Sequence, residues 1–335
     1  MEIDTLTHRQ RLESVVAFTK PDRTPVALWR HFPVDDQTPD SLAAATAHFQ
    51  RTFDFDLIKV TPASSFCLKD LGCRDEWQGN PEGTRTYTRT AIHHPEDWRK
   101  LKVLDPRKGH LGQQLECLNL LIKEFSDSTP ILQSIFNPLS QAKNLAGSSQ
   151  LMVHLHKYPE AVEAGLKIIT LNTLGFIEEL LKTGIDGIFY AIQHAQYELL
   201  TETEFARFSI PYDQQILAAV KPLWLNMAHL HGENVMFDTV ANYPVQVLNW
   251  HDRHTQPDLA AASTRYSGIV CGGLSRVETM VLGTPADVNK EARKAFNDMG
   301  GKNLILGTGC VVPVTAPYGN YMAARRFVAE SSLSA

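Results

Sequence analysis

The chain has 335 residues, 43% of them hydrophobic, and a formal net charge of −5; this length suits two ordinary domains or one large α/β barrel. The acidic balance and the lack of a lysine/arginine run argue against nucleic acid or an anionic membrane surface as the main partner. Residues 1–20 are polar, apolar runs are too short to cross a membrane, and the five cysteines lack a disulfide framework. We therefore expect a reduced, cytoplasmic protein.

Short apolar runs rich in β-branched residues recur along the chain, and each ends at a proline, a glycine or a polar residue. Because they lack strict alternation, they are typical of parallel strands that are covered on both faces. The eight predicted strands are residues 24–32, 55–62, 129–138, 184–192, 222–231, 244–251, 267–275 and 303–310.

Helical patterns separate several of these strands, with apolar residues at three- and four-residue spacing. They cover residues 41–53, 159–184, 201–221 and 284–301. Strands that alternate with helices predict a (β/α)8 barrel, formed by residues 1–335 as a single domain. A doubly wound sheet is the alternative, but no G-x-G-x-x-G segment follows the first strand.

The stretch 63–128 after the second predicted strand is too long for a simple connection. Within it, residues 74–92 alternate on both sides of an Asn-Pro-Glu-Gly turn, which predicts a hairpin. Long insertions at the carboxyl ends of barrel strands commonly shape the mouth of a substrate site.

Active sites of such barrels lie at the carboxyl ends of the strands. Arg30 is unusual after an apolar run: it is expected to bind a substrate carboxylate or phosphate, or to pair with an acid at the rim. Tyr190 and His251 are further catalytic candidates, although a strand-end tyrosine also serves packing and a polar loop would look like the surroundings of His251. The other predicted substrate contacts are His31, Asn137, Gln193 and Asn249.

His229 and His231 are two residues apart at the end of the fifth predicted strand, so both side chains point to the same side. Cys310 ends the eighth strand and supplies a thiolate. Two imidazoles, one thiolate and a vacant position suit a catalytic zinc ion. Alternatively, the histidines bind substrate carboxylates or close the barrel rim, and Cys310 is a small apolar filler.

Several segments resemble the uroporphyrinogen decarboxylase superfamily, in the right order and over nearly the whole chain. They are RQRLESVVAFTKPDRTPVALWRHFP, GIDGIFYAIQHAQYELLTETEFARFSIPYDQQIL, HLHGEN, VQVLNWHDR and NLILGTGCVVPVTAPYGNYMAA. The resemblance implies a (β/α)8 barrel with its cleft at the carboxyl ends of the strands.

The decarboxylases of the haem pathway need no metal, and this chain departs from their motifs in three places. Their R-Q-A-G-R segment is here WRHFP, which keeps Arg30 but has no second arginine. The second strand ends in KVTP without the catalytic aspartate, and Thr308 replaces the histidine of the G-H-G segment. These departures count against the haem-pathway reaction. Cofactor-free decarboxylation of uroporphyrinogen or another pyrrole carboxylate is accordingly the alternative function and not the first one.

The cobalamin-dependent methyltransferases of the superfamily bind zinc through H-x-C on the fifth strand and a cysteine after the eighth. His229 and Cys310 match this pattern, and His231 replaces the middle cysteine. The resemblance implies methyl transfer to a thiol-type acceptor from a small methyl donor or from a methylated corrinoid (cobalamin) on a partner protein. A homodimer is compatible with it, and a non-catalytic corrinoid- or tetrapyrrole-binding barrel is the third alternative.

Overall fold

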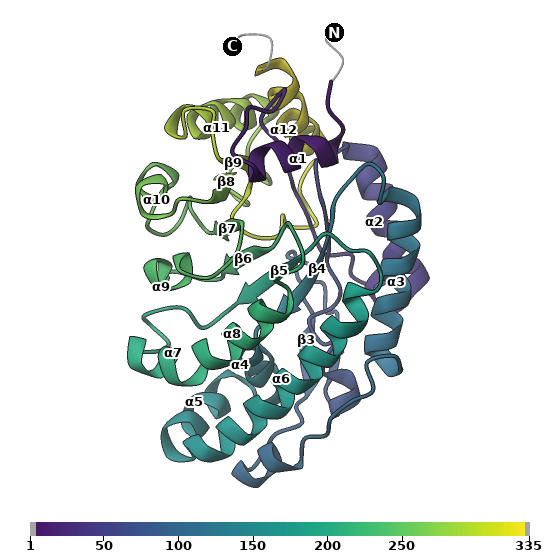
Figure 1. The fold of residues 1–335 in the computed structure, drawn as a ribbon, viewed down its shortest axis with the longest axis vertical. Coiled ribbons are helices and arrows are strands. Elements are labelled where there is room, and N and C mark those ends of the chain that lie inside the picture. Colours follow the sequence, from purple (N-terminus) through teal and green to yellow (C-terminus); the bar gives the residue numbers. More distant parts are fainter. Residues whose placement is uncertain (1–4, 332–335) are drawn as a thin grey trace.

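A curled parallel sheet surrounded by helices forms the centre of the molecule (Figure 1). The computed structural model describes residues 5–331, and within them the main sheet has seven strands in the order β1-β4-β5-β6-β7-β8-β9. Their bounds are β1 Ile58–Val60, β4 Ile131–Phe136, β5 Gly187–Ile192, β6 Met227–Leu230, β7 Val247–Trp250, β8 Ile269–Leu274 and β9 Leu304–Thr308. These strands are buried almost throughout, which explains their continuous apolar character.

The first predicted strand closes the sheet between β9 and β1. Val26 forms an isolated parallel bridge with Leu306, and the Ala27 amide donates to the Leu306 carbonyl at 2.9 Å. On the other side, the Asp56 amide donates to the Val26 carbonyl at 2.8 Å. The predicted barrel is therefore confirmed, but residues 24–32 close it through one isolated bridge and a few backbone hydrogen bonds, without a regular strand.

Helices cover the outside of the sheet, and α2, α3 and α6 lie along one side of it in Figure 1. Several of them begin with proline in the first turn, where its missing N–H leaves no hydrogen bond unmade. The α-helices are α1 His8–Val16, α2 Pro39–Phe53, α3 Gly109–Phe125, α4 Pro138–Ala146, α5 Ser148–Lys157, α6 Pro159–Leu181, α7 Glu202–Phe208, α8 Ile210–Ala219, α9 Phe237–Ala241, α10 Leu259–Arg265, α11 Pro285–Asp298 and α12 Tyr318–Ser331. Short 3-10 turns are η1 Asp35–Gln37, η2 Lys69–Leu71 and η3 Pro95–Lys100.

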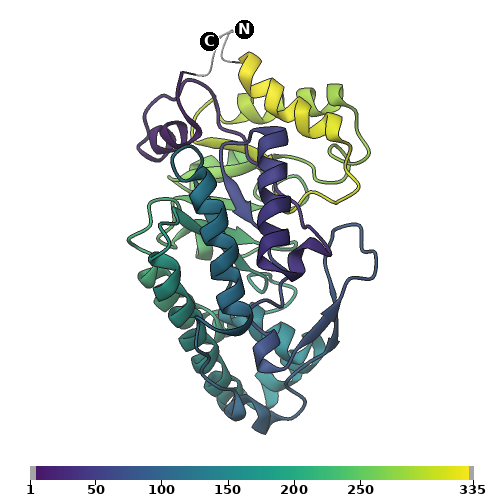
Figure 2. The same cartoon turned by 90° about the vertical axis from the view of Figure 1, so that its right-hand side faces the viewer.

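The segment between β1 and β4 contains the predicted hairpin and an additional helix. Strands β2 Arg74–Glu76 and β3 Thr86–Arg89 pair antiparallel, and Figure 2 shows them projecting from the side of the barrel. Helix α3 then returns the chain to β4. The sequence prediction did not include this helix, which occupies the position of the regular helix between two neighbouring barrel strands.

One predicted helix, residues 201–221, is interrupted. It consists of α7 and α8, which meet at Ser209. Pro211 lies in the first turn of α8, where its ring cannot continue the hydrogen-bond ladder of α7. The interruption is therefore a local effect of this proline.

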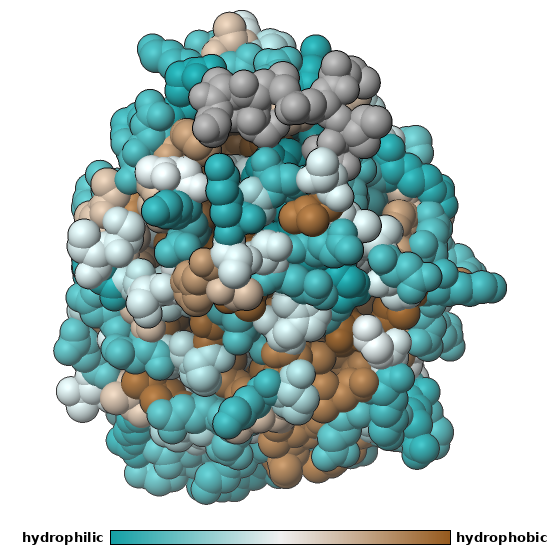
Figure 3. Space-filling view, turned by 45° about the horizontal axis from the view of Figure 1, so that its top comes forward, coloured by the Kyte–Doolittle hydropathy of each residue, from teal (hydrophilic) through white to brown (hydrophobic). Residues whose placement is uncertain are grey.

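Hydrophilic residues cover most of the face shown in Figure 3, and hydrophobic ones gather toward its lower edge. Among residues 5–331, every helix is too short or too polar to cross a membrane.

Candidate metal centre and cavity

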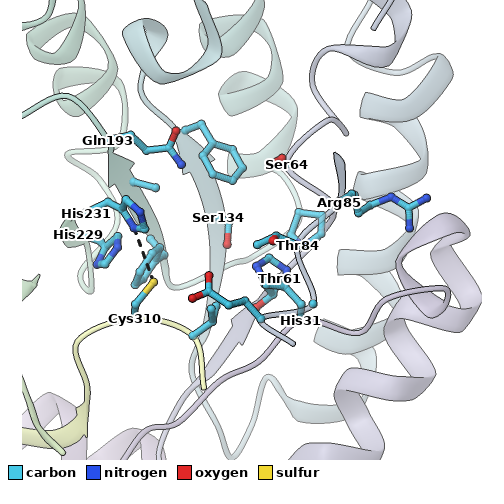
Figure 4. A pocket seen from close by; sticks show the side chains of 18 of the residues that line it. His31, Thr61, Ser64, Thr84, Arg85, Ser134, Gln193, His229, His231 and Cys310 are labelled. Carbon is cyan, nitrogen blue, oxygen red and sulfur yellow. Dashed lines mark hydrogen bonds between the residues drawn. The ribbon is translucent and has the colours of Figure 1, made fainter. Parts of the chain in front are cut away.

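Three histidines and one cysteine converge at the carboxyl ends of β6, β7 and β9. One possible ligand atom of each lies within 4.8 Å of those of the others; the residues are His229, His231, His251 and Cys310. Figure 4 shows Cys310 directed toward His231 and His229 from the loop after β9. Imidazole nitrogens and a thiolate are the donor set that zinc prefers, so these residues fit a zinc ion.

Strand β6 positions two of the histidines. His229 and the next-but-one residue, His231, point to the same side because side chains alternate along a strand. The His229 ring is 3% exposed and stacks on Phe189 of β5 with 5.2 Å between ring centroids. His231 Nδ1 lies 3.9 Å from Cys310 Sγ. The structure thus brings together the three residues that the sequence suggested as metal ligands.

Asn249 fixes the orientation and the tautomer of His229. Its Nδ2 donates to the carbonyls of Cys271 at 2.8 Å and Thr308 at 3.0 Å, so its Oδ1 must face the histidine. His229 Nδ1 lies 2.7 Å from that oxygen and therefore carries the proton. The lone pair is left on Nε2, as a metal ligand requires. Asn249, predicted as a substrate contact, instead positions His229.

The Cys310 thiol is buried beside the histidine rings. Burial alone would raise its pKa, but His229, and then His231 and His251, hold the pKa well below its usual range. Burial lowers the pKa of His229, and the neighbouring Cys310 offsets part of this effect. The Thr308 hydroxyl donates to the Cys310 carbonyl at 2.6 Å and so fixes the turn that presents the thiol. The thiol and the imidazoles thus compete for the same protons, and a cation that replaced these protons would be held by a thiolate and neutral imidazoles.

A cavity of about 310 Å³ opens beside these ligands, large enough for a small molecule. His229, His231 and Cys310 form part of its wall (Figure 4). Other lining residues include Trp29, His31, Lys59, Thr61, Ser134, Phe136, Lys143, Phe189, Gln193 and Val311. The mixture of apolar walls and a few polar groups is typical of a binding site for a small molecule.

Two predicted substrate contacts, His31 and Gln193, do line this cavity. Burial, together with the charges of Lys59 and Arg276, lowers the pKa of His31 to about 3, so its ring is neutral. Gln193 Oε1 is buried and has no hydrogen-bond partner among the described residues. A buried amide oxygen without a partner is costly, and a ligand donor would satisfy it.

Lys59 places a buried cation in the same cavity. Its Nζ lies 4.5 Å from the centroid of the Phe189 ring. Burial lowers the pKa of this lysine to about 8, and within residues 5–331 no carboxylate pairs with it. The sequence prediction missed Lys59, although a lysine inside an apolar strand is a signal in itself, because such residues are rarely buried without a partner.

The turn of the β2–β3 hairpin covers one side of the cavity. Pro81 accepts a hydrogen bond from the Val314 amide at 2.8 Å, and Glu82 pairs with Arg276 of the loop after β8. Arg85 points away from the metal ligands in Figure 4 and pairs with buried carboxylates on the outer side. The hairpin therefore shapes the mouth, as predicted, and is attached to two barrel loops.

Arg30, predicted to anchor the substrate, lies outside this cavity. Its Nε donates to the His31 carbonyl at 3.2 Å, and its guanidinium carbon is 5.5 Å from the centroid of the Phe32 ring. It borders a smaller hollow on the other side of the first barrel segment. The structure thus packs Arg30 against Phe32 and outside the cavity in which the substrate contact was predicted.

Tyr190 and Asn137 also face away from the cavity. On β5, Phe189 and Ala191 line the cavity, so the alternating Tyr190 must point to the helices. Its hydroxyl donates to Asp213 Oδ1 at 2.6 Å, and Asn137 Nδ2 donates to the same oxygen at 3.1 Å. Both residues thus belong to a buried polar network behind the strand, and neither lines the cavity.

Comparison with known proteins assigns the family. The model of the family described as uroporphyrinogen decarboxylase (URO-D) matches residues 7–331. A methylcobamide:CoM methyltransferase MtbA of Methanosarcina acetivorans is 27% identical over 236 residues, which are 69% of this chain and 67% of that protein. A uroporphyrinogen decarboxylase of Chlorobaculum parvum is 25% identical over 252 residues, 69% of this chain and 68% of the relative.

The fold is shared with a solved methyltransferase from Methanosarcina mazei. The two structures superimpose with a TM-score of 0.85 over 97% of this chain and 99% of the other, at 17% identity. The family match covers nearly all of the described residues, including every strand of the barrel and all four converging side chains. The chain therefore belongs to the uroporphyrinogen decarboxylase family.

Proposed function

We propose that this protein is a zinc-dependent methyltransferase that moves a methyl group from a methylated corrinoid to a small thiol. The observation that carries the proposal is the convergence of His229, His231 and Cys310 at one side of a cavity. Relatives named methylcobamide:CoM methyltransferase support the reaction class.

The residues around the cavity suit this chemistry. A zinc ion held by His229, His231 and Cys310 would act as a Lewis acid and lower the pKa of an acceptor thiol. Asn249 keeps the donor nitrogen of His229 turned toward the cavity. The apolar rings of Phe136 and Phe189 limit water near the acceptor, which strengthens electrostatic interactions there.

Lys59 supports an acceptor that carries a negative charge. The ammonium group is buried in the cavity without a carboxylate partner among the described residues, so an anionic group of the ligand would compensate its charge. Charge-assisted hydrogen bonds to such a group are stronger than neutral ones. The acceptor is thus a small thiol with an acidic group, and its methyl donor is a corrinoid bound to a partner protein or free in solution.

Decarboxylation is the second candidate, because the family also includes uroporphyrinogen decarboxylases. The same Lys59 would bind a substrate carboxylate. The two candidates differ in their need for metal, since this alternative uses His229 and His231 as proton donors or carboxylate ligands.

The test measures metal content and methyl transfer together. Protein purified without chelator should contain one zinc per chain and should demethylate methylcobalamin in the presence of coenzyme M. Cys310→Ser should lose most of the zinc, and its rate should fall by roughly 100-fold or more, because a ligand is removed. Far-UV circular dichroism should stay unchanged, since Cys310 lies at the barrel mouth.

Cys67→Ser is the matched control, because Cys67 is a free cysteine outside the converging group. It should keep both zinc and activity. Equal activity of zinc-free and zinc-loaded protein, or zinc-independent decarboxylation of uroporphyrinogen, would contradict the proposed methyl transfer.

A further inference from the structure

Two lysines, Lys59 and Lys143, bring positive charge into the wall of the cavity. Lys59 is 9% exposed and Lys143 is half-buried, and within residues 5–331 no carboxylate forms an ion pair with either ammonium group. Burial lowers the pKa of both, and the neighbouring Cys310 offsets only part of this effect at Lys59. Because lysine is rarely buried without a partner, a ligand that supplies negative charge would stabilise both side chains.

The acidic side chains of the cavity wall do not compensate the two lysines, because each acid already has a partner. Asp36 pairs with Arg85 at 3.3 Å, and Glu82 pairs with Arg276. The charges of these acids are therefore already offset by arginines. The two lysines remain as the charges of the wall that a ligand would have to match.

The two lysines reach the cavity from different depths. Lys59 pairs in register with Leu132 of β4, four residues before Phe136, where that strand ends. Lys143 belongs to α4, which begins at Pro138, just beyond this end. Four residues of strand rise by roughly 13 Å, so Lys59 extends into the cavity from within the barrel and Lys143 from its mouth.

Hydrogen bonds fix the position of α4 at this mouth. The Gln193 amide at the end of β5 donates to Ser140 Oγ at 2.9 Å, and Gln141 Nε2 donates to the Phe136 carbonyl at 2.7 Å. The helix that carries Lys143 is thus attached to two neighbouring strands. A cation on such a support is pre-organised for a ligand, because little backbone entropy is lost on binding.

We propose that the acceptor carries two acidic groups, of which one binds Lys59 and the other binds Lys143. The thiol of this acceptor rests on the proposed function, whereas its two negative charges follow from the two lysines. Coenzyme M has a single acidic group and would leave one lysine without a partner. The cavity of about 310 Å³ suits a small thiol with two acidic groups, such as a thiol dicarboxylate.

Calorimetric titration of the full chain with straight-chain dicarboxylates, from succinate to pimelate, tests the two charges without the thiol. One chain length should bind at least roughly 10-fold more tightly than the monocarboxylate with the same number of carbon atoms, because a second charge-assisted contact is made. Lys143→Met should remove this preference and leave the affinity for the monocarboxylate unchanged. Lys143→Arg, which keeps the charge, should keep the preference.

Lys157→Met is the matched control, because Lys157 is exposed on the neighbouring α5. It should bind both kinds of acid as the wild type does. Far-UV circular dichroism checks that every variant is folded. No loss of folding is expected for Lys143→Met, since the substitution removes a half-buried charge and keeps an unbranched side chain.

The 2-mercapto derivative of the preferred dicarboxylate then tests the acceptor itself. In methyl transfer from methylcobalamin, its KM should be at least roughly 10-fold below that of the 2-mercapto monocarboxylate of equal length, because only the dicarboxylate contacts both lysines. In Lys143→Met the two KM values should become equal.

The outcomes separate this inference from the proposed function. If no dicarboxylate binds more tightly than its monocarboxylate, or if Lys143→Met keeps the preference, the inference fails while methyl transfer to coenzyme M can still succeed. Equal KM values of the two thiols in the wild type would also overturn it and leave the proposed function intact. A preference for dicarboxylates without methyl transfer to any thiol would refute the proposed function and, with it, the thiol of this acceptor.

Discussion

Lys59 is a cation kept inside the barrel at the expense of stability. Burial disfavours its charged form and lowers its pKa from the ordinary value of 10.5 to about 8. The folded chain therefore holds fewer protons than the unfolded chain between pH 8 and 10.5. Stability must rise with pH in this window, because the unfolded state binds the additional proton.

Lys59→Met should accordingly stabilise the protein near pH 7 while weakening the binding of an anionic thiol. Removal of the buried charge should raise the free energy of unfolding by on the order of 3 kcal/mol at pH 7, and this gain should disappear toward pH 10.5. The dissociation constant of the acceptor should rise by roughly 10-fold or more. Urea unfolding at several pH values and calorimetric titration measure the two effects.

An exposed lysine on α3, Lys123, gives the control. Lys123→Met should change neither the pH dependence nor the affinity. The free energy of unfolding of Lys59→Met could instead differ from that of the wild type by a constant amount from pH 7 to 10.5. This result would contradict the lowered pKa of Lys59.

At the scale of elements, the hairpin turn at the mouth of the cavity is sensitive to a single added methyl group. Gly83 has φ +77°, and a Cβ there would lie 2.6 Å from the His31 Cβ and 2.9 Å from Val314. Gly79, in the same hairpin, has φ +80° but nothing within 4 Å of such a Cβ. The two glycines thus share a backbone conformation that strains other residues, and they differ in what an added side chain would meet.

A comparison of Gly83→Ala with Gly79→Ala therefore separates the cost of a positive φ from the cost of a steric contact. Both should lose about 1 kcal/mol of stability, because alanine disfavours a positive φ. Gly83→Ala should lose a further 1–3 kcal/mol, roughly, through the forced shift of the turn, and its KM for the acceptor should rise. Gly79→Ala should keep the wild-type KM. Equal KM values for the two variants would show that the turn does not shape the cavity.

Sequence patterns predicted the elements better than their contacts. Buried parallel strands have continuous apolar runs, so the barrel and its β2–β3 hairpin could be recognised. The stretch that contains α3 was assigned to an insertion, because the hairpin pattern dominated it. The residues 24–32 matched a strand pattern, but the degree of pairing depends on how the two edges of the closed sheet meet, which no local pattern contains.

The site shows the same limit. The pair His229 and His231 follows from strand alternation, and Cys310 from its position at a strand end. The approach of His251 to Cys310 depends on barrel closure and on Gly309, where a Cβ atom would lie 2.4 Å from the Trp250 carbonyl oxygen, so the sequence indicated a cleft residue only. Tyr190 was predicted to face the cavity, but its two neighbours on β5 do so instead. A continuous apolar run does not show which of its alternating side chains point into the barrel.

At the scale of the whole molecule, Asp56 joins the first and second segments of the barrel at the end away from the cavity. Its carboxylate is fully buried and accepts from Arg11 at 2.6 Å, Arg23 at 2.7 Å and the Val26 amide at 2.7 Å. Burial raises the pKa of Asp56, but His8 and the two arginines hold it far below its ordinary range. The network ties α1 to the segment that closes the sheet.

Asp56→Asn should therefore destabilise the whole barrel, by about 3–5 kcal/mol, because a neutral amide would no longer offset the buried positive charges of Arg11 and Arg23 beside it. Chemical denaturation measures the loss. Asp54→Asn is the control: that carboxylate is 56% exposed in its pairing with Arg325 and should change stability by less than about 1 kcal/mol. Zinc bound per folded chain should be unaffected in both, since the network lies away from the strand ends that carry the candidate metal ligands.

The Phe189 ring lies between His229 and Lys59, and its position bears on which acceptor thiols can react. The ring packs against His229 at one side of the site and lies beneath the Lys59 ammonium group. A rigid aromatic ring thus sets a fixed span between the cation and the metal ligands. Under the proposed function, the distance between the sulfur and the acidic group of an acceptor would have to match this span. We expect homologous thiols with one or two additional methylene groups to bind but to react slowly, because only one end can be in place at a time.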